Sequence, residues 1–225
     1  MRLFGKTPLI GEDLNDWIID NFDWVESERP AWWVMAELIR PTREYFHAPG
    51  GHDHETALLV FEDMKRQLGT TQPVALEPLP DLPDELLHDY TRMSDTAGQY
   101  WDDAETPLIT YNPKLMRRPV MFINTLAHEL IHARLAPVVD DLPGGAPAHE
   151  LATDLHAIIA GYGVIQLEAA EQAGWAGYMS QASRAVALAE FLHRKAIAPD
   201  DAFPYLSRRP ASWLRKALAS RKRVR

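Results

Sequence analysis

The stretch Thr125–His132 reads TLAHELIH and decides how the rest of this chain is interpreted. It places a His-Glu-x-x-His pattern inside an apolar run, which predicts a buried helix over Pro119–Leu135. Residues four apart on a helix share one face, so His128 and His132 can bind the same metal ion. Glu129 would then lie beside that ion as a general base.

A second motif begins seventeen residues beyond His132, in the segment HELATDLH that starts at His149. Glu150 and Asp154 are one helical turn apart there, so they share a face. A catalytic zinc ion takes three protein ligands and keeps one position open, and His128, His132 and Glu150 supply such a set. Asp154 is placed to accept a hydrogen bond from the other ring nitrogen of a ligand His.

Two alternatives stay open from the residues alone. His149 adjoins Glu150 and could replace it as the third ligand. Adjacent helical side chains point about 100° apart, so only one of the two can share the face of Asp154, and the one-turn spacing favours Glu150. The first motif could also belong to a buried helix without metal, in which Glu129 pairs with a nearby His or with Arg134. The second motif would then be a coincidence, so we favour the metal site.

The two motifs resemble the signature of the gluzincin metallopeptidases, which is HExxH followed on a second helix by ExxxD. The resemblance covers about residues 105–165. The matching positions are His128, Glu129, His132, Glu150 and Asp154. A looser resemblance is to a group of uncharacterised bacterial zincin-like proteins with the same two-motif core.

The resemblance implies an α+β, zincin-like fold in which a small sheet packs against a two-helix metal-binding core, with additional C-terminal helices. It implies a Zn²⁺-dependent peptidase, in which metal-activated water attacks a peptide or protein substrate and Glu129 is the general base. Residues Pro107–Tyr111 occupy the position of the edge strand that binds extended substrate in zincins. Candidate donors to the developing oxyanion are His149, His156, Tyr162 and Tyr111. The alternative function is a non-proteolytic, metal-binding regulatory or interaction module on a zincin scaffold, and a third is a structural domain without metal.

Composition is that of an ordinary globular protein. The chain has 225 residues, 46% of them hydrophobic and 24% charged, and it has no Cys, so metal ligands must be His or carboxylates. We expect a single domain over residues 1–225. Its parts would be an N-terminal helix and strand portion (1–104), the metal-site core (105–165) and C-terminal helices with a basic tail (166–225). No signal-like or membrane-length apolar run is visible, so we expect a cytoplasmic protein without a membrane partner.

Charge is unevenly distributed along the chain. The net charge is −9, yet the end of the chain from Ser207 to Arg225 carries eight basic and no acidic residues. Such a tail can contact nucleic acid. The acidic remainder of the chain argues against this, so we expect a solvated end helix and no nucleic-acid partner.

The remaining patterns predict the other elements. Helices are expected at Glu12–Phe22, Thr56–Leu68, Ala148–Ala160, Ser180–Lys195 and Pro210–Ser220, and strands at Trp32–Ile39, Pro73–Pro78, Gln99–Trp101 and Leu108–Tyr111. The segment Gly161–Gly163 is expected to end the second metal-site helix, and Pro80–Ser94 to hold one helical turn. We interpret His52–His54 as a solvated loop rather than an accessory metal site, and the early Trp residues as core packing.

Overall fold

The computed structural model describes residues 8–79, 98–101, 107–174 and 178–221. The predicted turn at Pro80–Ser94 lies outside the described residues. The longer elements, in chain order, are α1 (Glu12–Glu28), α2 (Pro30–Met35), α3 (His54–Leu68), β1 (Ala75–Pro78), β2 (Gly98–Trp101), β3 (Leu108–Tyr111), α5 (Pro119–Leu135), α6 (His149–Ala157), α7 (Gly163–Gln172), α8 (Gln181–Arg194) and α9 (Arg208–Arg221). Short 3-10 turns lie at Pro113–Arg117, Ala136–Asp141, Ala146–Ala148, Pro199–Asp201 and Phe203–Tyr205, and a π-helical turn lies at Ile158–Tyr162.

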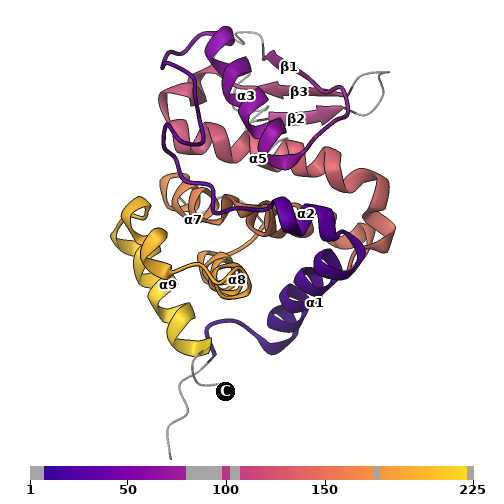
Figure 1. Cartoon of the computed structure of the whole chain (residues 1–225), viewed down its shortest axis with the longest axis vertical. Helices are drawn as coiled ribbons and strands as arrows, with labels where there is room; N and C mark the ends of the chain where they lie inside the picture. The colour runs from indigo at the N-terminus through magenta and orange to yellow at the C-terminus, as the bar shows by residue number, and fades with distance from the viewer. Residues whose placement is uncertain (1–7, 80–97, 102–106, 175–177, 222–225) are drawn as a thin grey trace, which may run out of the picture.

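Three short strands form one mixed sheet in the order β1-β3-β2. β3 pairs in parallel with β1, where Ala75 faces Leu108, and antiparallel with β2, where Gly98 faces Tyr111. Figure 1 shows this sheet at the top of the molecule, with α3 and α5 beside it. β3 is therefore the central strand. The prediction that Pro107–Tyr111 forms a substrate-binding edge is wrong, because strands on both sides already pair with its backbone.

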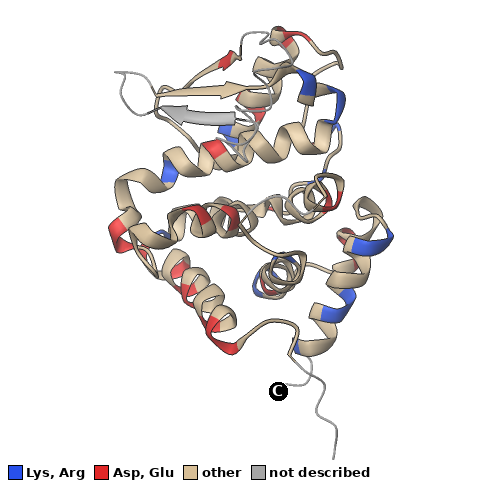
Figure 2. Ribbon diagram, turned by 180° about the vertical axis from the view of Figure 1, so that it is seen from behind, with Lys and Arg blue, Asp and Glu red and all other residues tan. Residues whose placement is uncertain are grey.

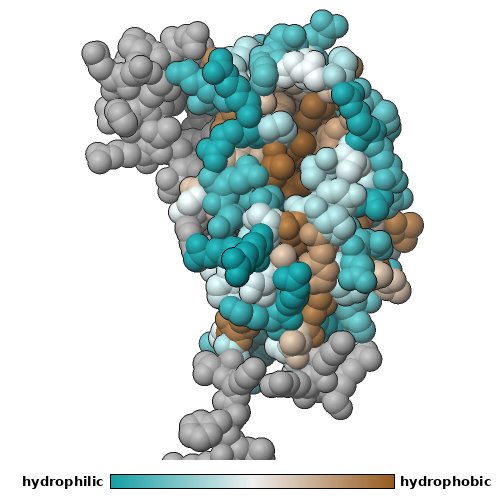
Figure 3. Space-filling model, turned by 90° about the vertical axis from the view of Figure 1, so that its left-hand side faces the viewer, coloured by the Kyte–Doolittle hydropathy of each residue, from teal (hydrophilic) through white to brown (hydrophobic). Residues whose placement is uncertain are grey.

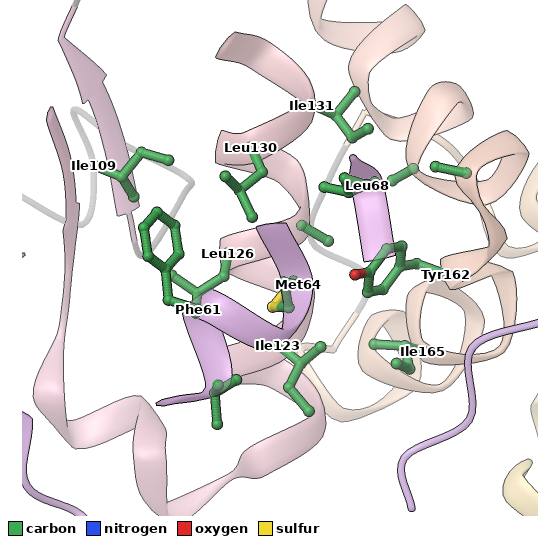
Figure 4. Packing of buried hydrophobic residues seen from close by; sticks show 14 of the residues in the cluster. Phe61, Met64, Leu68, Ile109, Ile123, Leu126, Leu130, Ile131, Tyr162 and Ile165 are labelled. Atoms are coloured by element: carbon green, nitrogen blue, oxygen red, sulfur yellow. The ribbon is translucent and has the colours of Figure 1, made fainter. Parts of the chain in front are cut away.

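Helix α5 is the central helix of the molecule. Its buried residues lie on most of its circumference, as expected for a helix covered on several sides. On one side it packs against α3 and the sheet, and Figure 4 shows Phe61 and Met64 of α3 beside Leu126 of α5. On another side it contacts α6 and α7. The predicted bounds, Pro119–Leu135, agree with the structure.

A second apolar cluster fills the lower part of the molecule. It joins α1, α7, α8 and α9, and the partly buried Trp17, Trp24 and Trp32 contact both this cluster and the one around α5. The early Trp residues therefore connect the two halves of the core, in agreement with the interpretation that they are packing residues.

The strand predicted over Trp32–Ile39 is wrong. Pro30 occupies the first turn of α2, where its missing N–H costs nothing, and this short helix carries Trp32 and Trp33. The rings of Phe22 and Phe191 lie edge-on to Trp33 at centroid distances of 6.0 Å and 5.9 Å. The chain becomes extended only after Met35, and there it lies against a helix turn rather than in the sheet.

Most of the other helices agree with the sequence, and capping residues define several of their ends. Asp53 caps α3 by accepting from the backbone N–H of Thr56, and Gly69 ends it with a left-handed φ of 62°. Ser180 caps α8 through the N–H of Ser183. Helix α1 continues to Glu28, beyond the predicted end.

Gly161 does not end the helical segment as predicted. The chain passes from α6 through the π-helical turn and continues as α7, with a kink at Gly161, where φ is 105°. The Gly161 carbonyl accepts a hydrogen bond from the N–H of Ile39, at 3.0 Å. The extended segment after α2 is thereby fixed to the kink. A Cβ at Gly161 would lie 1.8 Å from the carbonyl oxygen of Glu37, so this close approach requires glycine.

Two helices of the lower half carry opposite charge. Figure 2 shows acidic residues along α1 and basic residues along α9. The last four residues of the basic tail, 222–225, lie outside the described part of the chain. Among the described residues, no helix combines the length and apolar character needed to cross a membrane.

Gly161→Ala should destabilise the protein by about 3 kcal/mol. Alanine is strained at this positive φ, and its Cβ would clash with the carbonyl oxygen of Glu37. Gly174→Ala is the matched control, because Gly174 has a φ of 68° but no described atom lies within 4 Å of the added Cβ. This substitution should therefore cost about 1 kcal/mol. Urea unfolding of both variants measures the difference. Equal losses would show that the approach to Glu37 does not matter.

Candidate metal centre

The two His of the first motif project from the middle of α5 toward α6. His128 is buried, and the side chain of His132 is 13% exposed. Their rings lie edge to face with centroids 4.9 Å apart. The four-residue spacing on a well-packed helix therefore brings both imidazoles to one place, as the sequence predicts.

Glu150 completes the group from the first turn of α6. Its Oε1 lies 3.0 Å from Nε2 of His132, and its Oε2 lies 3.4 Å from Nε2 of His128. One ligand atom from each of the three residues lies within 4.8 Å of the others. No other group of three or more His and carboxylate side chains in the described part of the chain is this close together. The Glu150 side chain is 43% exposed, so the group is open to solvent on that side.

Asp154 orients His128 through the ring nitrogen that faces away from Glu150. Its Oδ1 lies 3.2 Å from Nδ1 of His128, so this ring nitrogen donates and Nε2 is left facing Glu150. Its Oδ2 accepts from the backbone N–H groups of Tyr178 and Met179, at 3.0 Å and 3.2 Å. A carboxylate that holds the outer nitrogen of a His is the usual support of a metal-ligating imidazole.

Arg184 of α8 holds Asp154 in turn, and the sequence analysis did not single out this residue. Its Nη2 lies 2.8 Å from Asp154 Oδ2, and its Nε donates to Gln166 of α7 at 3.2 Å. Both residues of the Arg184 and Asp154 pair are buried. The two lie thirty residues apart, so no local spacing connects them. A basic residue on the buried face of α8 was the one signal available.

The carboxylates of the site favour positive charge between the two rings. Burial raises the pKa of Glu129, although His128 and His132 partly offset this effect. Burial by itself would lower the pKa of His128, but hydrogen bonds with Asp154 and Glu150 outweigh it and raise that pKa to about 10. Hydrogen bonds from both rings hold the pKa of Glu150 well below its usual range. The carboxylates that stabilise a positive charge on His128 would also stabilise a bound divalent cation, so the donor set fits zinc.

Of the four candidate oxyanion donors, His149 alone is placed beside the group by a contact. Its ring centroid lies 4.5 Å from that of His132, and its Nε2 is buried without a hydrogen-bond partner in the described part of the chain. Burial and the neighbouring His132 lower its pKa. A neutral imidazole with an unsatisfied nitrogen is therefore available next to the ligands.

The other three candidates make hydrogen bonds elsewhere. His156 contacts Oδ1 of Asn21 through Nε2 at 3.0 Å, and burial lowers its pKa to about 3. The Tyr162 hydroxyl donates to Gln67 at 2.6 Å. The hydroxyl of Tyr111 lies 3.2 Å from Nδ1 of His54. These contacts occur in the core or beside α3, so the structure gives no support to an oxyanion role for these residues.

Tyr178 is a further side chain near the ligands that the sequence did not single out. Its ring is stacked with that of His128 at a centroid distance of 6.5 Å, and it is 53% exposed. The backbone hydrogen bond to Asp154 fixes this position. Tyr178 is thus an exposed aromatic and hydroxyl group at the margin of the site.

The described contacts give no support to the alternative in which Glu129 pairs with Arg134. Arg134 lies over the ring of Trp32 at 4.1 Å, and no ion pair joins it to Glu129 in the described structure. Of the segment His52–His54, which the sequence analysis interprets as a loop, Asp53 caps α3, and His54 is the first residue of that helix and stacks on Tyr111.

In comparisons with known proteins, no family model, no curated protein and no solved structure matches this chain.

Asp154→Asn should weaken zinc binding about 10- to 100-fold, because the negative charge that orients His128 is lost. Arg184→Met should act in the same direction, since it leaves Asp154 without its cationic partner. Zinc affinity is measured by competition with a chromogenic chelator.

Asp63→Asn is the matched control, because Asp63 is equally buried but belongs to α3, where it accepts from the backbone of His47 and pairs with Arg66. It should lose stability and keep its zinc affinity. If both Asp variants bound zinc as tightly as the unmodified protein, Asp154 would have no part in a metal site.

Proposed function

We propose that this chain is a zinc-dependent peptidase, with His128, His132 and Glu150 as metal ligands and Glu129 as the general base. One observation supports this more than any other. The Nε2 atoms of both His and the Glu150 carboxylate converge, while Asp154 fixes the His128 ring from behind. This arrangement matches the three protein ligands and oriented imidazole of a catalytic zinc site.

A bound zinc ion would supply Lewis-acid polarisation of the substrate carbonyl and would activate water. Glu129 is buried next to both His, and burial raises its pKa. A more basic carboxylate takes the proton of the attacking water more readily and can pass it to the leaving amine. The open side of Glu150 leaves room for a substrate to approach.

Two groups at the margin are suited to the developing oxyanion. His149 carries a buried nitrogen without a partner, and Tyr178 presents an exposed ring beside His128. Donors positioned where negative charge develops are a large contribution to hydrolysis. In the strand order, β2 is the end strand that contacts α5, so an extended peptide could add to this edge rather than to β3.

The second candidate is a metal-binding regulatory or interaction module without proteolysis. It is favoured by one observation, namely that Tyr111, His156 and Tyr162 are engaged elsewhere. Such a module would bind zinc with the same ligands and would not cleave an unbiased peptide library.

Glu129→Gln should keep the metal and lower peptide hydrolysis by about 10²-fold or more, because the proton acceptor is lost while the ligands remain. Turnover on an unbiased peptide library and zinc content are measured on the same sample. Asp63→Asn, far from the ligands, should hydrolyse at the unmodified rate. Full activity in Glu129→Gln would contradict the assigned base, and zinc binding without any turnover in the unmodified protein would favour the module.

A further inference from the structure

A cavity of about 410 Å³ lies between the segment that follows α2, the first turns of α3 and the start of α5. Its walls are largely apolar and include Pro41, Phe46, Val60, Met116, Phe122 and Ile123. Figure 3 shows apolar surface in a hollow on this face, with hydrophilic residues around it. The volume lies within the range of small-molecule sites, which are concave and mostly apolar with a few polar groups.

This cavity is separate from the candidate metal centre. Phe122 and Ile123 lie more than a helical turn before His128 on α5, and they face α3, whereas His128 faces α6. Figure 4 shows Ile123 on the side of α5 that meets α3. A ligand here would therefore bind beside the same helix without contacting the zinc ligands.

The charged side chain of the cavity lining is a cation. Arg43 lines it, and no acidic residue does among those that the structure describes. The Arg43 guanidinium donates to the carbonyls of Ala48 and Pro49, at 3.0 Å and 2.9 Å, and forms no salt bridge within the described residues. Two of its five N–H groups are used in this way, so others remain for an anion. Asp53 lies nearby, but it caps α3 through the N–H of Thr56.

A hydroxyl group inside the lining also has no partner. Oγ1 of Thr42 is buried and makes no hydrogen bond in the described structure. A buried polar atom without a partner costs free energy, and a ligand with an acceptor group would remove that cost. The loop that holds Thr42 and Arg43 is fixed by the two Arg43 hydrogen bonds, so both groups are held at the cavity.

We infer that this cavity binds a small amphiphilic carboxylate, with the apolar body among the Phe and Ile side chains and the carboxylate at Arg43 and Thr42. The apolar walls supply the affinity through buried area. The guanidinium selects a carboxylate over a neutral or cationic head group, because a charge-assisted hydrogen bond is stronger than a neutral one.

Titration calorimetry of the full chain with octanoate and with octanol tests this inference. The unmodified protein should bind both and prefer octanoate. Ala48→Phe, which fills the cavity from its rim, should abolish binding of both probes. Arg43→Gln should reduce the preference for octanoate over octanol by roughly three- to tenfold, as expected for a partly exposed ion pair. Arg43→Lys, which keeps the positive charge, should retain most of the preference for octanoate over octanol.

Arg117→Gln is the matched control, because Arg117 is exposed next to Met116 but does not line the cavity. It should leave the preference unchanged. The inference would be overturned by no binding of either probe at millimolar concentration, by an unchanged preference in Arg43→Gln, or by unchanged binding in Ala48→Phe. Octanoate binding that is lost only when zinc is removed would place the carboxylate on the metal and would also overturn it.

Discussion

The buried carboxylate of Asp154 is the interaction on which the rest of the candidate site depends. It accepts from His128 of α5, from Arg184 of α8 and from two backbone N–H groups that precede α8. A buried charge is stable only when it is paired and hydrogen-bonded, so these partners require one another. The result is that α8, which carries no metal ligand, fixes the orientation of a His on α5.

The sequence was sufficient for those parts of the site that follow helical spacing. The four-residue intervals from His128 to His132 and from Glu150 to Asp154 predicted which side chains share a face, and the structure brings these faces together. The start of α8 at Ser180 was similarly accessible, because a capping residue acts on the next three residues. Helical spacing and capping depend only on residues close together in the sequence, so they can be predicted from short segments of the chain.

The features that sequence reasoning missed depend on contacts between distant segments. Arg184 reaches Asp154 across thirty residues, and the kink at Gly161 is held by Ile39, so neither has a local signature. A glycine in a helical sequence usually indicates the end of the helix. Here the helical segment continues through a kink at Gly161, which the hydrogen bond from Ile39 stabilises. The Trp-rich segment has strand composition, yet its first-turn proline and ring contacts on both sides favour α2. The resemblance to zincins placed β3 at an edge, and the sequence of one strand does not reveal which strands pair with it.

The most direct test of the account is anomalous diffraction at the zinc edge from crystals of the zinc-loaded protein. We expect a single strong peak between Nε2 of His128, Nε2 of His132 and a carboxylate oxygen of Glu150, at about 2 Å from each. Nδ1 of His128 should remain bonded to Asp154. A peak bonded to His149 in place of Glu150 would remove the resemblance to the gluzincin ligand set, and the absence of any peak at these residues would contradict the metal site itself.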